Sequence, residues 1–163
     1  MPGPTAYAGG MFKPRPDVVE ALREMLPVVD ADGTLTQHLE AELDSKRPDL
    51  TDVLLAVASR AVAGQLDLGR ILTAATCRAG CALLGRRHPG AIIEVRVPPF
   101  AAVQVGFGTG PRHTRGTPPN VVEASPATFI ALATGHLGWA EADVRASGTH
   151  AHEAAAAFPL TRP

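Results

Sequence analysis

The spacing of the apolar residues changes at His88-Pro89-Gly90, and this change divides the chain into two differently folded parts. Before it, apolar residues recur every three or four positions, which is typical of helices with one buried face. After it come the runs IIEVRV (92–97) and AAVQVGF (101–107), which are rich in β-branched residues. Such runs are typical of strands. The sequence therefore predicts a helical part followed by a part that contains a sheet.

Four helices are expected in the first part. Asp17 is suited to cap the first, and Pro27 would end it because proline removes a backbone donor. The second would end near Pro48, and the third would be closed by Gly64. The fourth would run from a cap at Asp67 to about residue 87. Its expected apolar face consists of Leu68, Ile71, Leu72, Ala75, Ala79, Ala82 and Leu83.

The second part continues with a third strand near 120–123 and a helix over 126–135, for which Ser125 is the expected cap. A short turn at 137–142 and a last strand at 143–151 would follow. Residues 1–16 are rich in proline and glycine without a period, which predicts a flexible arm. We therefore expect three regions: the arm at 1–16, a helical extension at 17–66 and an α/β domain at 67–163.

Composition argues against several classes of protein. The chain has 163 residues and a net charge of −1, which argues against a nucleic-acid-binding protein and a basic membrane-surface protein. No apolar run approaches the length of a transmembrane helix, and the first residues lack the pattern of a secretory signal. Two cysteines do not make a disulfide framework. A cytoplasmic protein is the expectation.

A loop rich in proline, glycine and arginine lies between the second and third strands. Arg112, His113 and Arg115 fall within four positions, and no acid occurs between Glu94 and Glu123. Two interpretations remain open. The arginines could hold a carboxylate or phosphate, because a guanidinium offers a planar fork of donors. They could instead pair with the two glutamates or with backbone carbonyls and fix the loop.

The other reactive residue types have simpler interpretations. Cys77 and Cys81 are four apart on one helix, but a closed zinc site needs four ligands, so small buried apolar residues are favoured. His150 and His152 would share one face of the last strand and be exposed. His136 follows a helix end, where a cation is favourable. We expect neither a metal nor another cofactor.

The sequence also argues against an enzyme. A serine hydrolase of the α/β type would carry Gly-x-Ser-x-Gly, and the chain has no such motif. The glycines at 106, 108 and 110 precede a proline-rich loop rather than a helix, so they do not match a phosphate-binding loop.

Four sequence blocks resemble a known family. They are EVRVPPFAAVQ (94–104), GPRHTRGTPPNVVE (110–123), FIALATGHLGW (129–139) and VRASGTHA (144–151). Together they are similar to the actinobacterial branch of the sterol-carrier-protein-like family, the bacterial sterol carrier protein orthologs, over roughly residues 78–160. The resemblance implies an α+β fold in which helices cover one face of a mostly antiparallel sheet. It also implies an apolar tunnel between the two layers and binding of lipid rather than catalysis.

On this basis we expect a non-catalytic carrier of a hydrophobic small molecule, of the fatty acid, acyl-CoA or sterol class. The expected wall of the tunnel consists of Phe100, Val103, Val105 and Phe107 from the strands, and Phe129, Ile130, Leu132, Ala133 and Trp139 from the facing helix and its end. The alternative is an interaction module whose interior is filled and whose N-terminal region mediates a homodimer. An apolar cavity of about 300 Å³ or more would favour the carrier.

Overall fold

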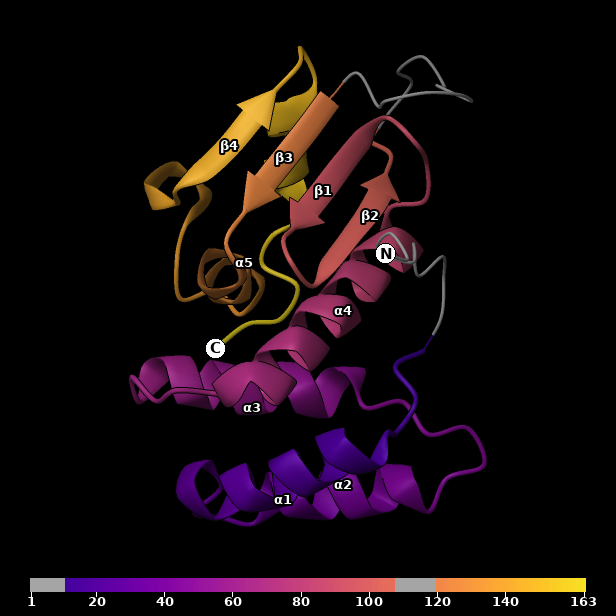
Figure 1. Ribbon diagram of the computed structural model, residues 1–163, viewed down its shortest axis with the longest axis vertical. Helices are drawn as coiled ribbons and strands as arrows, with labels where there is room; N and C mark the ends of the chain where they lie inside the picture. Colours follow the sequence, from indigo (N-terminus) through magenta and orange to yellow (C-terminus); the bar gives the residue numbers. More distant parts are fainter. Residues whose placement is uncertain (1–10, 108–119) are drawn as a thin grey trace.

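The structure, a computed structural model, describes residues 11–107 and 120–163 (Figure 1). In the described residues four helices come first, followed by a sheet that is accompanied by one short α-helix and two 3₁₀ helices, which confirms the predicted α+β class. The elements are α1 (Pro16–Val29), α2 (Thr34–Leu43), α3 (Thr51–Ala63), α4 (Gly69–Arg87), β1 (Ile93–Val97), β2 (Ala101–Val105), β3 (Asn120–Ala124), α5 (Pro126–Ala133), the 3₁₀ helix η1 (Trp139–Glu141), β4 (Val144–Ser147) and the 3₁₀ helix η2 (Ala151–Ala157).

The four strands form one mixed sheet in the order β2-β1-β3-β4. β1 is antiparallel to β2 and parallel to β3, and β3 is antiparallel to β4, so two of the three pairings are antiparallel. Val95 lies opposite Val103 on one side and Val122 on the other, and all three side chains are buried. Because side chains alternate along a strand, these valines belong to the one apolar face that packs against helices.

Helix α4 lies between two apolar cores (Figure 1). Its residues Cys77 and Cys81 belong to the core beneath the sheet, whereas Leu72 and Ala79 belong to the core formed with α1, α2 and α3. The prediction of a single apolar face is therefore wrong: Ile71, expected on that face, is 45% exposed. A helix that is buried on two opposite sides has no single apolar stripe. The 3.6-residue period therefore could not predict which residues of α4 are exposed.

The first helix departs from the prediction at both ends. It begins with Pro16 at its first position, and Asp17 lies in the first turn, where its carboxylate accepts hydrogen bonds from Arg15. Pro27 does not end it. The helix continues to Val29 and Asp30 N still donates to Leu26 O at 2.8 Å, because a proline in the last turn removes only its own backbone donor.

The predicted boundary near residues 66 and 67 falls in the turn between α3 and α4. Packing continues across it, since α3 contributes Leu55 and Ala58 to the core beneath the sheet. Ser59 Oγ also lies 2.9 Å from Nε2 of His136, just past α5. Helices α3 and α4 therefore pack against both the N-terminal helices and the sheet, and they join these two parts of the fold.

The last strand is shorter than predicted. β4 ends at Ser147 rather than near residue 151, because Gly148 adopts a φ of 103° that takes the backbone out of the extended region. The alanine-rich run at 153–157 lies within η2.

Candidate functional site

The layer between the sheet and helices α4 and α5 is built from apolar side chains. Its two titratable groups are thiols. Burial raises the pKa of Cys77 to about 12 and also raises the pKa of Cys81 far above its usual range. Both groups therefore stay neutral near pH 7 and act as small apolar side chains, the interpretation that the sequence favoured.

The structure brings most of the predicted wall residues into this layer. Val103 and Val105 face it from β2, and Phe129, Ile130 and Ala133 face it from α5. Three others lie half-buried against its margin: Phe100, Phe107 and Trp139. Leu132 is buried as well, but it is not among the residues of this layer.

Two glycines of α4 bring the helix into direct contact with the predicted wall. A methyl group at Gly80 would lie 2.8 Å from Cε1 of Phe129, and one at Gly85 would lie 3.0 Å from Cγ2 of Val103. The side chains of Phe129 and Val103 therefore occupy the space that these glycines leave. At these two places the interior is packed by the protein's own atoms, and a ligand would have to displace some of them.

Residues 158–163 also pack into this layer. The sequence analysis did not predict this contribution. Phe158 lies between Phe129 and Trp139, with ring centroids 6.0 and 5.9 Å away. Leu160 is buried in the same core as the wall residues. The sequence carried only a weak signal here, because an apolar-proline-apolar triplet has no helical or strand period.

Hydrogen bonds fix this segment against α4 and α5. The amides of Leu160 and Thr161 both donate to the carbonyl of Ala133, at 2.8 and 3.0 Å. Arg87 Nη1 donates to the carbonyl of Leu160 at 2.7 Å. In Figure 1 the end of the chain passes between α5 and α4.

A buried asparagine ties the sheet to η2. Asn120 Nδ2 donates to Ile92 O at 3.0 Å, and its Oδ1 accepts from the amide of His150 at 2.8 Å. The prediction that His150 and His152 share a strand face is wrong, because β4 ends earlier. His150 precedes η2, and its Nδ1 lies 2.6 Å from Oε1 of Glu153.

The predicted anion-binding or loop-fixing residues Arg112, His113 and Arg115 lie outside the described residues. One of the glutamates proposed to pair with them, Glu94, forms an ion pair with Arg96 on its own strand.

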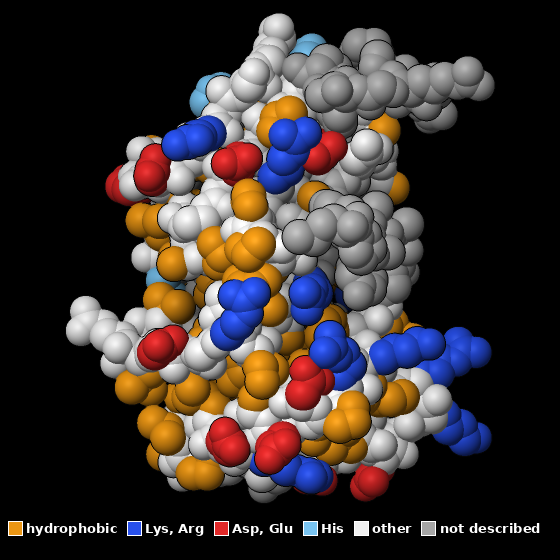
Figure 2. Space-filling view, in the orientation of Figure 1, with side chains coloured by type: hydrophobic (Ala, Val, Ile, Leu, Met, Phe, Trp, Pro, Cys, Tyr) orange, Lys and Arg blue, Asp and Glu red, His pale blue; other side chains and the backbone are white. Residues whose placement is uncertain are grey.

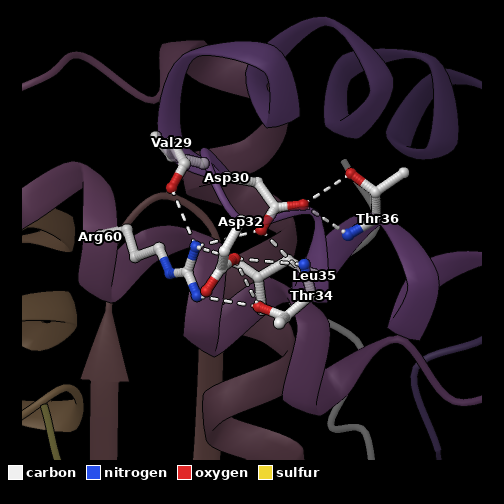
Figure 3. Close-up of polar contacts among 7 residues, drawn as sticks. All are labelled: Val29, Asp30, Asp32, Thr34, Leu35, Thr36 and Arg60. Carbon is white, nitrogen blue, oxygen red and sulfur yellow. Dashed lines mark hydrogen bonds and ion pairs between the residues drawn. The ribbon is translucent and has the colours of Figure 1, made fainter.

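A second polar cluster joins α1, α2 and α3 (Figure 3). The carboxylate of Asp30 accepts hydrogen bonds from the amides of Leu35 and Thr36, from the Thr36 hydroxyl at 2.6 Å and from Arg60 Nη1 at 3.1 Å. Burial would raise the pKa of Asp30, but the hydrogen bonds from Thr36 and Leu35 outweigh it and hold the pKa well below its usual range. The protein's own donors satisfy this carboxylate, so the cluster has a structural role: it holds α1, α2 and α3 together. We call it the Asp30 staple.

Two hollows open on the surface of the described residues. One, of about 320 Å³, is lined by Pro98, Glu123, Ala124, Ser125, Pro126, Asp143 and Arg145. The other, of about 710 Å³, runs along α1 and is lined by Pro14, Arg15, Pro16, Val19, Glu20, Arg23 and Glu24. Both combine acidic and basic groups, and Figure 2 shows both kinds of charge interspersed over the visible face.

The described part of the chain carries neither a membrane-spanning helix nor a cluster of metal ligands. None of its helices combines the length and the apolarity needed to cross a bilayer. Within residues 11–107 and 120–163, no three His, Cys, Asp or Glu side chains are placed to hold a metal ion together.

Comparison with known proteins identifies the segment that contains most of this layer. A family model described as bacterial SCP ortholog matches residues 69–160. The match begins with α4, includes the whole sheet and α5, and ends at Leu160. A search of curated proteins gave no match. Because the matched segment is more than half of the 163 residues, the chain belongs to the bacterial sterol-carrier-protein (SCP) ortholog family.

Proposed function

We propose that the protein binds a hydrophobic small molecule of the lipid class and releases it unchanged. The site is the layer between the sheet and helices α4 and α5. The observation that carries the proposal is the composition of that layer, which is apolar and, apart from Leu55 and Ala58 of α3, lies within the segment that matches the SCP family. An apolar layer between a sheet and its helices suits the hydrocarbon part of a lipid.

The energetics allow moderate affinity. A chain of about 16 carbons gains about 12 kcal/mol on leaving water, at roughly 0.8 kcal/mol per methylene. Association costs on the order of 4–15 kcal/mol, and displacing the protein's own side chains adds to that cost. At the lower end of that cost the net gain is about 8 kcal/mol, so the dissociation constants are micromolar or weaker.

The chemistry of the layer supports binding rather than catalysis. The titratable groups within it are the thiols of Cys77 and Cys81, and the pKa of each is raised by burial. A thiol that remains protonated is a poor nucleophile and a poor base. We therefore propose a carrier and not an enzyme.

Trp139 gives a direct test, because it lies half-buried against the layer beside Phe158. Titration with a fatty acid, an acyl-CoA or a sterol should shift its emission to the blue and reach saturation. Ala133→Phe should abolish the shift, because Ala133 is fully buried in the layer and a larger side chain fills it. Overpacking of this kind costs about 1–3 kcal/mol of stability.

The matched control is Ala79→Phe. Ala79 is also fully buried, but it faces the core formed with α1–α3. It should lose stability to a similar extent and keep the lipid response. Unchanged emission with all three lipid classes, together with no heat in calorimetry, would contradict the proposal.

One observation favours a second function, that of an interaction module. The close contacts at Gly80 and Gly85 fill the interior with the protein's own side chains, as such a module requires. On that account no lipid binds, and the protein forms a homodimer through its N-terminal region. Sedimentation would show a dimer whose dissociation constant does not change when lipid is added.

A further inference from the structure

We propose that residues 158–163 occupy the place of the ligand in this structure. The side chains of Phe158 and Leu160 stand where an acyl chain binds, and the carbonyl of Leu160 stands where an acidic head group meets Arg87. This inference rests on the proposed function and narrows its ligand to a single-chain lipid with a carboxylate head group. It also makes the 158–163 segment a competitor of that lipid.

The apolar half of the segment is packed as a ligand would be. Leu160 is 4% exposed, and its Cδ1 lies 3.5 Å from the position of a methyl group at Gly80. Phe158 meets Phe129 edge to face and lies tilted beside Trp139. Here the layer is filled by a segment without helix or strand structure, so it can open without breaking the sheet or a helix.

The segment also provides a backbone carbonyl that accepts a hydrogen bond from a cationic side chain. Arg87 is in the last turn of α4, and its Nη1 donates to the carbonyl of Leu160 at 2.7 Å. A guanidinium has five donors and binds a carboxylate through two parallel hydrogen bonds, which are stronger than a bond to a neutral carbonyl. A lipid carboxylate at this position therefore replaces the Leu160 carbonyl with a better partner. The neighbouring Arg86 instead lies 3.4 Å from the carboxylate of Asp49.

The remaining contacts let the segment leave while η2 stays. Ala151, Ala154 and Ala157 are three positions apart, so the three residues per turn of a 3₁₀ helix place them on one buried face. Four hydrogen bonds hold the next residues. The Phe158 amide donates to Ala155 O, the amides of Leu160 and Thr161 donate to Ala133 O, and Arg87 donates to the carbonyl of Leu160. Water can satisfy the backbone groups once the segment moves out.

Hydrogen exchange tests the displacement directly. The amides of Leu160 and Thr161 should be protected in the free protein, because both donate to Ala133 O. Saturation with dodecanoate, at a concentration below its micelle threshold, should remove this protection while the amides of β1 and α4 stay protected. Retained protection at residues 160 and 161 with dodecanoate bound would overturn the inference and leave the proposed function standing.

Leu160→Ala tests the competition in the full chain. Removing the buried side chain weakens the hold of the segment, so the lipid-competent population rises and the apparent affinity for dodecanoate should increase about tenfold. The matched control is Leu72→Ala, which truncates a leucine buried on the other side of α4. It should lower the melting temperature without raising the affinity. Weaker binding by Leu160→Ala, or equal gains in both variants, would overturn the inference.

Arg87→Ala tests the head group. Dodecanoate and dodecanol share the same chain, so the ratio of their affinities isolates the contribution of the carboxylate. The native protein should prefer dodecanoate about tenfold or more, and Arg87→Ala should remove that preference. Arg86→Ala should retain it. A preference that survives in Arg87→Ala would overturn the assignment of Arg87. No binding of either compound to the native protein or to Leu160→Ala would overturn this inference, whereas the proposed function fails only when acyl-CoA and sterol do not bind either.

Discussion

At the scale of single residues, burial decides what each polar group does. The thiols of Cys77 and Cys81 are enclosed by apolar atoms, and the resulting rise in pKa removes their reactivity. Asp30 is buried too, but its hydrogen bonds favour the charged form. Burial therefore makes the thiols of one core inert, whereas hydrogen bonds keep the buried carboxylate beside the other core charged.

The thiols should react slowly in the folded protein. Because both pKa values are raised, few thiolates exist at pH 8, and the side chains are enclosed as well. Alkylation followed by mass spectrometry should label neither cysteine in native protein within the time that labels both in denaturant. Rapid labelling of either one without denaturant would contradict the assigned packing.

Asp30 should make stability depend on acid. Its pKa in the folded protein lies below the ordinary 3.8, so it stabilises the fold above about pH 4 and this contribution is lost as pH falls further. Asp30→Asn should lower the melting temperature at pH 7, and the difference from the native protein should shrink toward pH 2. Asp44→Asn, at an exposed position, is the control and should change little. A difference that is constant with pH would count against the staple.

At the scale of elements, α4 is the part on which both cores depend. Periodicity predicted its limits closely, as it did those of α3, β1, β2 and α5. Periodicity did not predict the features that depend on contacts between residues far apart in the sequence. The parallel pairing of β1 with β3 leaves no local pattern, and neither does the position of Phe158 and Leu160 against α5. Val103 and Val105 are buried on the same face of β2, and this could be predicted because the alternation along a strand is local.

Gly80 should be intolerant of a side chain. Alanine would favour the helix by about 1 kcal/mol, but its methyl group would lie 2.8 Å from Phe129, which is 1% exposed and has no room to move. Overpacking costs about 1–3 kcal/mol, so Gly80→Ala should lower the free energy of unfolding in urea.

The control for Gly80 is Gly64→Ala at the end of α3, where the nearest atoms are at an ordinary 3.4 Å. It should be neutral. In the Gly80→Ala background, Phe129→Leu should cost less than it does alone, because the smaller side chain relieves the contact. Additive effects of the two substitutions would contradict direct packing between them.

At the scale of the whole molecule, one helix joins two layers with different roles. The helices α1, α2 and α3 and one side of α4 enclose a core held by the Asp30 staple. The other side of α4, with α5 and the sheet, encloses the layer proposed to take lipid. Because α4 also packs against α1–α3, it can keep its place when residues 158–163 are displaced as proposed. On this account the helical extension supports the wall of the proposed site and lines it only through α3, with Leu55 and Ala58.

The central claim is that a lipid enters the layer beneath the sheet. Nuclear Overhauser effects between the protons of a bound fatty acid and the protein's methyl groups test it most directly. The account predicts effects from the acyl chain to methyl groups of Val103, Ile130 and Ala133, all buried in that layer. Effects confined to exposed methyl groups such as those of Val28, which is 64% exposed, would contradict it, as would none at all.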